Sequence, residues 1–206
     1  MRAIVLTFRL LLALASLFLL AAPAARADDI EIREANLRTA DEGVVLNAEF
    51  AILLGPRLRE AVANGVPLYF VIEFDLTRPR WYWFDEKTAS KRTQVRLSYH
   101  ALSRQYRLST GVVQQNFESL EEAINVLKHV HNWLVVERGV TASDARYEAA
   151  VRMRLDTGLL PKPLQVSALI NREWNLESPW KRFTFRAPQQ PPAPVETREQ
   201  PQGRAQ

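Results

Sequence analysis

Apolar and polar residues alternate with a period of two along several segments of the chain. In the clearest of these, residues 145–156, Tyr147, Val151 and Leu155 share one face, while arginine and acidic residues occupy the other. This period is that of a half-buried β-strand. Because parallel strands are usually apolar on both faces, the alternation favours antiparallel sheets with one solvated face. Further strands are predicted at 44–52, 66–76, 94–100 and 106–108, and more weakly at 30–37 and 183–185.

Two segments have helical rather than strand-like spacing. Residues 56–64 begin with proline and are followed by Gly65, the usual asymmetry of helix ends. Residues 119–132 begin with a capping-box pattern, Ser119 and Glu122. Their apolar positions then recur at helical spacing, at Leu120, Ala123, Ile124, Leu127, Val130 and Leu134.

Residues 164–172 fit two structures, because their alternation suits a strand and their length suits a helix; we favour a strand. The predicted fold is therefore mainly β, of the α+β class. It has antiparallel sheets in a sandwich-like arrangement and two packed helices, at 56–64 and 119–132.

The N-terminal residues 1–27 have the pattern of a cleavable export signal. Arg2 and Arg9 precede an apolar run of about 13 residues, and Ala25-Arg26-Ala27 matches the small-x-small cleavage pattern. A transmembrane helix needs roughly 20 apolar residues, so this run is too short, although an uncleaved anchor is the alternative. We expect a single β-rich domain at 28–186 and a disordered, Pro/Gln-rich tail at 187–206.

The charge balance and the lack of cysteine indicate where the protein is located and which kinds of partner it can bind. The chain has 27 basic and 23 acidic residues, and loss of residues 1–27 would leave a net charge of +1. This near-neutral balance predicts no nucleic-acid partner. No stretch after residue 27 could span a bilayer, so we expect no integral membrane span after cleavage. The chain has no cysteine, which excludes disulfides, thiol chemistry and a lipoprotein anchor. These features predict a periplasmic protein.

The common catalytic motifs are absent from the sequence, so we assign no catalytic residue and no cofactor. On a continuous helix His129 and His131 point about 200° apart and cannot share one metal ion, so no metal site is predicted. If the helix ends before His131, the two histidines can approach each other. Glu73 and Asp75 share a predicted strand face, as solvated surface residues or, alternatively, as an acid–base pair.

An unusual cluster of four consecutive aromatic residues, flanked by cations and acids, occupies 78–86. Exposed Trp and Arg suit a binding surface, although a strand covered on both faces would also explain the cluster. A second basic and aromatic group follows at 96–107. The predicted ligand or partner surface comprises Arg80, Trp81, Trp83, Asp85, Arg96, His100, Arg104 and Arg107.

Several stretches resemble a bacterial family known as the domain of unknown function 4390, some members of which are called proline-rich signal-peptide proteins. They are LYFVIEF at 68–74, RPRWYWFD at 78–85, LSYHALSRQY at 97–106, LLPKPL at 159–164 and EWNL at 173–176. The resemblance spans roughly residues 28–186. It implies a Gram-negative envelope protein, supplies no catalytic residues, and hints at a membrane sensor kinase as partner.

The function predicted from the sequence is a non-catalytic binding or protein-interaction module of the cell envelope. Two alternatives remain open. One is a hydrolase of an envelope polymer that uses Glu73, Asp75, Asp85 or His100. The other is a carrier of a small apolar ligand inside the sandwich.

Overall fold

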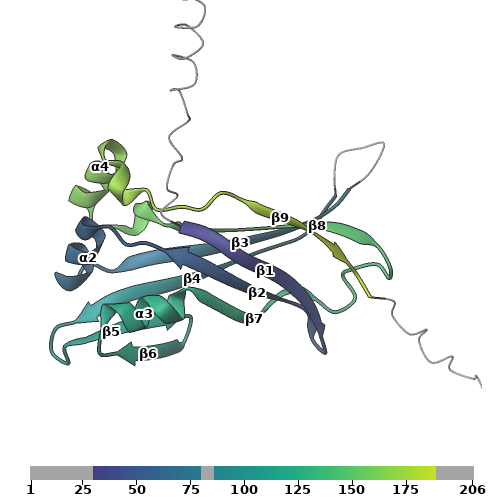
Figure 1. Ribbon diagram of the computed structural model, residues 1–206, viewed down its shortest axis with the longest axis horizontal. Helices are drawn as coiled ribbons and strands as arrows, with labels where there is room; N and C mark the ends of the chain where they lie inside the picture. Colours follow the sequence, from purple (N-terminus) through teal and green to yellow (C-terminus); the bar gives the residue numbers. More distant parts are fainter. Residues whose placement is uncertain (1–29, 80–85, 189–206) are drawn as a thin grey trace, which may run out of the picture.

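The computed structural model describes residues 30–79 and 86–188, which form two antiparallel sheets packed face to face (Figure 1). The predicted sandwich-like, mainly β fold is therefore confirmed. The predicted signal segment, the aromatic cluster at 80–85 and residues 189–206 of the predicted tail lie outside the described residues.

The two sheets differ in size. The smaller has the order β1-β2-β7, with β1 at Ile30–Ala40, β2 at Gly43–Ile52 and β7 at His129–Glu137. The larger has the order β6-β5-β4-β3-β8-β9. Its strands are β3 (Leu68–Arg78), β4 (Glu86–His100), β5 (Gln105–Thr110), β6 (Val113–Phe117), β8 (Arg146–Leu155) and β9 (Lys181–Arg186).

The core lies between the sheets and is built by the predicted alternation. On β3 the side chains of Phe70, Ile72 and Phe74 are almost fully buried, as are Tyr147 and Val151 on β8. Burial of these apolar side chains supplies the main driving force for packing the two sheets together.

Two lysines link the sheets at their margins. The Lys181 ammonium group on β9 donates hydrogen bonds to the carbonyl oxygens of Ile32 and Arg33 on β1, at 3.1 and 2.7 Å. The Lys91 ammonium group on β4 lies 3.1 Å from the Glu137 carboxylate on β7. The polar margins of the sandwich are thus joined through specific contacts, while its interior is apolar.

The first predicted helix is confirmed, and the second is shorter than predicted. Helix α2 covers Pro56–Ala63. Helix α3 covers Leu120–Leu127, and the Ser119 hydroxyl caps it by accepting a hydrogen bond from the Glu122 N–H. The prediction that it extends to residue 132 is wrong, because the chain from His129 onward pairs with β2.

The segment at 164–172 is helical, so the favoured strand is a further error. Helix α4 covers Lys162–Ile170, flanked by short 3-10 helices at Thr157–Leu159 and Arg172–Trp174. Leu164 and Ala168, four residues apart on one helix face, pack against the core. Val166, Leu169 and Ile170 are exposed. The apolar residues Leu164, Val166, Ala168 and Ile170 occupy every second position, and this spacing imitates a strand. Within the described part of the chain, no helix is long and apolar enough to cross a membrane.

Truncation of a core side chain on β3 should destabilise the protein strongly. We expect Phe70→Ala to lower the free energy of unfolding by about 3–5 kcal/mol, because it removes a large buried ring and leaves a cavity. Urea unfolding followed by circular dichroism measures the change. Leu169→Ala on α4 is the control, since that side chain is 87 % exposed and its loss should cost less than about 0.5 kcal/mol. Equal losses in both variants would contradict this placement of the core.

Candidate functional site

A row of charged residues crosses the outer face of the larger sheet near its centre. Because Ile72 and Phe74 point into the core, Glu73 between them points outward. The strand register places Arg92 of β4 directly opposite Glu73 on one side and Arg152 of β8 opposite it on the other. Side chains from three strands therefore converge on one carboxylate.

The contacts of Glu73 are short and come from three arginines. Its Oε1 lies 2.8 Å from Arg92 Nη2, and its Oε2 lies 2.5 Å from Arg152 Nε and 3.7 Å from Arg154 Nε. The Glu73 side chain is only 10 % exposed, whereas that of Arg92 is 67 % exposed. The carboxylate is thus covered by its partners, while the guanidinium groups reach the solvent.

The charge of Glu73 is stabilised by these arginines. Burial by itself would raise the pKa of the Glu73 carboxyl group, since it removes water from the charged form. The hydrogen bond from Arg152 and the positive charges of Arg152, Arg154 and Arg92 outweigh this effect and hold the pKa below its ordinary value of 4.5. Glu73 is consequently ionised at neutral pH.

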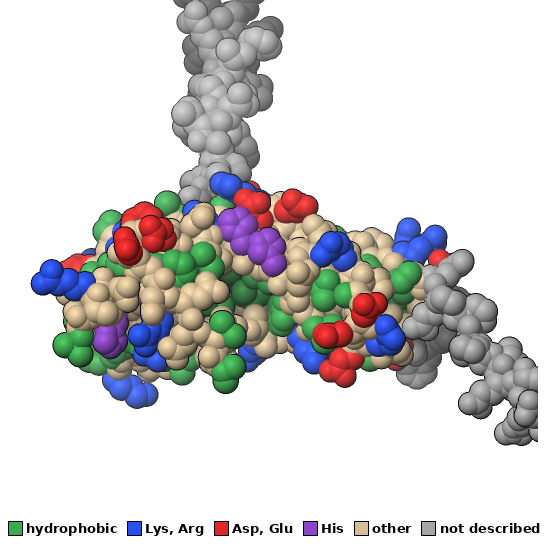
Figure 2. Space-filling view, turned by 90° about the horizontal axis from the view of Figure 1, so that it is seen from below, with side chains coloured by type: hydrophobic (Ala, Val, Ile, Leu, Met, Phe, Trp, Pro, Cys, Tyr) green, Lys and Arg blue, Asp and Glu red, His purple; other side chains and the backbone are tan. Residues whose placement is uncertain are grey.

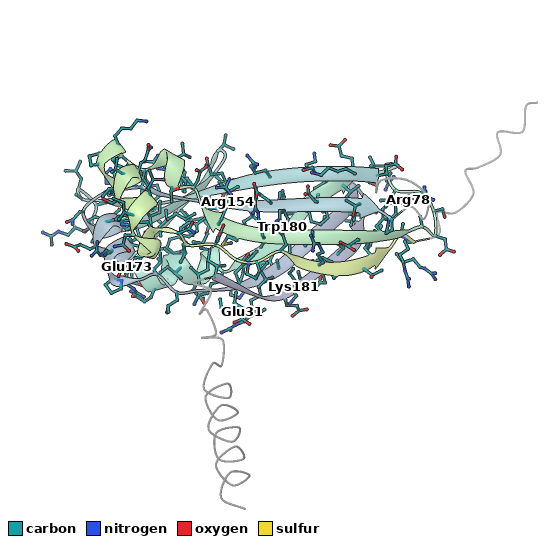
Figure 3. The ribbon with its side chains drawn as sticks, turned by 90° about the horizontal axis from the view of Figure 1, so that it is seen from above. Glu31, Arg78, Arg154, Glu173, Trp180 and Lys181 are labelled. Atoms are coloured by element: carbon teal, nitrogen blue, oxygen red, sulfur yellow. The ribbon has the colours of Figure 1, made fainter. Side chains whose placement is uncertain are left out.

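Two arginines on this face also stack on aromatic rings. The Arg96 guanidinium carbon lies 6.0 Å from the ring centre of Tyr69, and that of Arg152 lies 4.6 Å from the ring centre of Trp180. Such cation–π contacts order the long arginine side chains. Figure 3 shows Arg154 and Trp180 together over the middle of the sheet. We call Arg92, Arg96, Arg152 and Arg154, together with Glu73, the arginine face.

The arginine face carries more positive than negative charge. Its four guanidinium groups face three acids: Glu73, Asp156, 3.9 Å from Arg154, and Glu177, which pairs with Arg154 across an isolated β-bridge. Elsewhere on the same sheet some charges pair one to one, as in Lys87–Asp75 at 3.0 Å and Arg182–Glu148 at 3.3 Å. A surplus of one positive charge therefore remains among these seven residues.

The structure describes four of the eight residues predicted for the binding surface. Arg96 belongs to the arginine face, and Arg107 lies on the neighbouring strand β5, opposite Ser98. Arg107 Nε donates a 2.9 Å hydrogen bond to the Asn116 side chain. These two arginines share the outer face of the sheet.

The other two described residues lie at the turn between β4 and β5. His100 Nδ1 accepts a hydrogen bond from the Ser103 N–H at 3.4 Å, and Arg104 occupies the left-handed region with φ of 54°. Both residues are exposed and shape the turn. Arg80, Trp81, Trp83 and Asp85 lie outside the described residues.

The register separates the end of β3 from the predicted arginine group. Tyr69 lies opposite Arg96, and Arg78, the last residue of β3, lies opposite Glu86. At about 3.4 Å per residue, the stretch of β3 from Tyr69 to Arg78 is about 30 Å long, so the end of β3 is far from Arg96. Figure 3 shows Arg78 at the end of the molecule remote from α4 and Glu173.

A comparison with family models identifies residues 27–184 as matching the Domain of unknown function (DUF4390). The chain belongs to the DUF4390 family. No curated protein and no solved structure is significantly similar to it.

Two of the three carboxylates considered for hydrolysis in this DUF4390 protein have charged partners, and the third, Asp85, lies outside the described residues. Glu73 and Asp75 share the outer face of β3 as predicted, but Glu73 is held by arginines and Asp75 pairs with Lys87. A general acid in glycoside hydrolysis needs a raised pKa, whereas the pKa of Glu73 is lowered. Among the described residues, no three His, Cys, Asp or Glu side chains are grouped so that they could hold a metal ion as they stand.

A small apolar hollow opens between α3 and the β5–β6 hairpin. Ile72, Val95, Leu108, Val126 and Val130 contribute to its wall, and its volume is about 110 Å³. An apolar cavity of about 150 Å³ holds one benzene molecule. The hollow therefore fits a single small apolar group rather than a lipid chain.

The sequence analysis missed Arg92, Arg152, Arg154 and Trp180 as members of one surface. Arg152 and Arg154 are predicted to point outward, and so is Glu73, because all three follow the period-two pattern. The missing information is the strand order, since only the adjacency of β4, β3 and β8 brings these residues together.

Replacement of the central carboxylate should change how stability depends on pH. Because the pKa of Glu73 is lowered in the folded state, its stabilising contribution is complete above 4.5 and is lost as pH falls through the lowered value. We expect Glu73→Gln to cost about 1–2 kcal/mol at pH 7, measured by urea unfolding. The difference from the unaltered protein should shrink progressively below pH 4.5.

Glu148→Gln serves as the control for this prediction. Glu148 pairs with Arg182 on the same sheet, but both side chains are largely exposed, so the change should stay within about 0.5 kcal/mol. A Glu73→Gln variant as stable as the unaltered protein at pH 7 would show that the ion pairs of Glu73 with the arginines do not stabilise the fold.

Proposed function

We propose that this protein is an exported, non-catalytic interaction module of the cell envelope, whose arginine face binds an acidic segment of a partner protein. The observation that carries the proposal is the surplus of positive charge at the centre of the larger sheet. Arg92, Arg152 and Arg154 surround the covered Glu73 carboxylate there, and Arg96 lies farther along β4. The rings of Tyr69 and Trp180 stack on Arg96 and Arg152. Arginine, tryptophan and tyrosine are the residues that dominate binding energy at protein interfaces.

The arginine face is also ordered before any partner arrives. Contacts with Glu73, Tyr69 and Trp180 restrict the arginine side chains. Less side-chain entropy is then lost on binding, which favours affinity. A guanidinium group can in addition bind a partner carboxylate with two parallel hydrogen bonds.

The chemistry of the face favours an acidic protein segment over a lipid surface. Binding to a bilayer usually combines basic residues with apolar side chains that enter the acyl region. The exposed large apolar residues in the described ranges lie elsewhere, for example Leu169 and Ile170 on α4 and Val112 in the β5–β6 turn. The aromatic rings on the face, Tyr69 and Trp180, stack against arginines, and the face therefore presents mainly positive charge, which favours an acidic segment.

Two sequence features support export and an envelope partner. The first 27 residues have the charge, apolar run and cleavage pattern of an export signal. The DUF4390 match begins at residue 27, the last residue of that segment. The family resemblance suggests a membrane sensor kinase as one candidate partner.

Removal of two exposed arginines should weaken binding to an acidic probe. We expect Arg92→Gln/Arg96→Gln to bind a fluorescent oligoglutamate peptide about tenfold more weakly than the unaltered protein, measured by fluorescence anisotropy. The unaltered protein should lose affinity as salt is raised, because the interaction is electrostatic.

The matched control is Arg33→Gln/Arg38→Gln, which removes two exposed arginines from β1 on the other sheet. It should leave peptide binding unchanged. Equal weakening by both double variants would attribute binding to net charge and overturn the assignment of the face. Binding to phosphatidylglycerol vesicles that exceeds binding to the peptide would identify a lipid surface instead and would also overturn it.

Export predicts a defined mature N-terminus. Expression in a Gram-negative host should place a chain beginning at Asp28 in the periplasmic fraction, as determined by intact mass. Ala25→Arg/Ala27→Arg should block cleavage, since the peptidase requires small residues at these positions. Recovery of the unaltered protein only with residues 1–27 attached would contradict cleavage of the signal.

A further inference from the structure

The early end of α3 brings two histidines onto one face of a strand. His129 and His131 are the first and third residues of β7, so their side chains point to the same side of the sheet. Their rings are stacked with 5.8 Å between centroids and an interplanar angle of 10°. The helix ends before His131, which is the condition stated above for the two histidines to approach each other.

A backbone carbonyl group determines which ring nitrogen of neutral His129 carries the proton. Its Nδ1 lies 2.8 Å from the carbonyl oxygen of Asn125. Because a carbonyl oxygen only accepts hydrogen bonds, Nδ1 must carry the proton, and the lone pair of the neutral ring lies on Nε2. Metal-binding histidines have this arrangement, in which a hydrogen bond to one ring nitrogen orients the other toward the ion.

Two carboxylates continue the row of side chains across the smaller sheet. Glu49 of β2 lies opposite His129, and Glu34 of β1 lies opposite Glu49. Like charges directly opposite each other destabilise a sheet unless a cation relieves them. The Arg33 guanidinium, whose side chain is 63 % exposed, lies 3.4 Å from the Glu49 carboxylate.

These side chains surround a shallow cleft on the outer face of the smaller sheet. Both histidines, both glutamates, Asn36 and Asn47 line the cleft, whose volume is about 190 Å³. Figure 2 shows a pair of adjacent histidine side chains on this side of the molecule, with acidic side chains beside them. The cleft is open, so an ion could enter from the solvent.

We propose that His129 and His131, with Glu49 as third ligand, bind one divalent transition-metal ion of the copper or zinc type. A metal ion lies in the plane of each imidazole that binds it, so the two parallel rings cannot share an ion without a change of side-chain rotamer. Rotation of the His131 ring and of the Glu49 side chain brings a second nitrogen and an oxygen to an ion bound at His129, and water completes the coordination. Imidazole favours Cu²⁺ and Zn²⁺ over Mg²⁺ and Ca²⁺, and Cu²⁺ should bind more tightly than Zn²⁺. This site is separate from the arginine face and goes beyond the proposed function.

Titration of the purified, tag-free full chain with Cu²⁺ by isothermal calorimetry tests the proposal. We expect one ion per chain, and at least about tenfold weaker binding in His129→Ala and in His131→Ala. Glu49→Gln should weaken binding by a smaller factor, and binding equal to that of the unaltered protein would overturn Glu49 as a ligand.

His100→Ala is the matched control, since His100 is the third histidine of the chain and lies in the β4–β5 turn. It should bind Cu²⁺ like the unaltered protein. Unchanged binding in His129→Ala or His131→Ala, or equal weakening in His100→Ala, would overturn the site.

A measurement on the unaltered protein keeps the test independent of how the variants fold. In NMR spectra of the histidine side chains, Zn²⁺ should shift the resonances of His129 and His131 and leave those of His100 in place. Shifts of His100 alone, or of none of the three, would overturn the proposal.

Discussion

The burial of every second residue of β3 between the two sheets is the constraint on which the other features depend. Phe70, Ile72 and Phe74 must face the core, so Glu73 must face outward. A shift of the strand by one residue would exchange the two sets and place a carboxylate in the apolar interior. The register that satisfies the core therefore also fixes the position of the carboxylate around which the arginines gather.

The local pattern predicts most strands, and its errors occur where tertiary contacts decide the structure. Val130 and Leu134 fit both a continued helix α3 and an amphipathic strand. Pairing with β2 selects the strand, which a helical pattern within one segment cannot reveal. In α4 the residues Leu164, Val166, Ala168 and Ile170 are apolar at every second position like a strand, although only Leu164 and Ala168 contact the core.

Prediction of the candidate sites is less complete than prediction of the fold, because each site combines residues from strands that are distant in sequence. Arg96 and Arg107 are named by the sequence analysis, but Arg92 and Arg152 become neighbours of Glu73 only through the strand order. The two histidines show the same limit, since their relative direction depends on whether the local backbone is helical or extended. Residue type suggests the chemistry, and pairing between strands decides which groups meet.

The arrangement around Glu73 is difficult to explain by stability alone. The attraction within an ion pair that is removed from water offsets little more than the cost of its desolvation. A protein with apolar residues in place of the pair is often as stable. A sheet selected only for stability would match each arginine with one acid, as the pairs Lys87–Asp75 and Arg182–Glu148 do. At the centre of the sheet Arg92, Arg152 and Arg154 share Glu73, while Asp156 and Glu177 lie beside Arg154 alone, and the mutual repulsion of the arginines is a cost. An acidic partner would relieve that repulsion, so the same surplus that weakens the isolated protein would strengthen the complex.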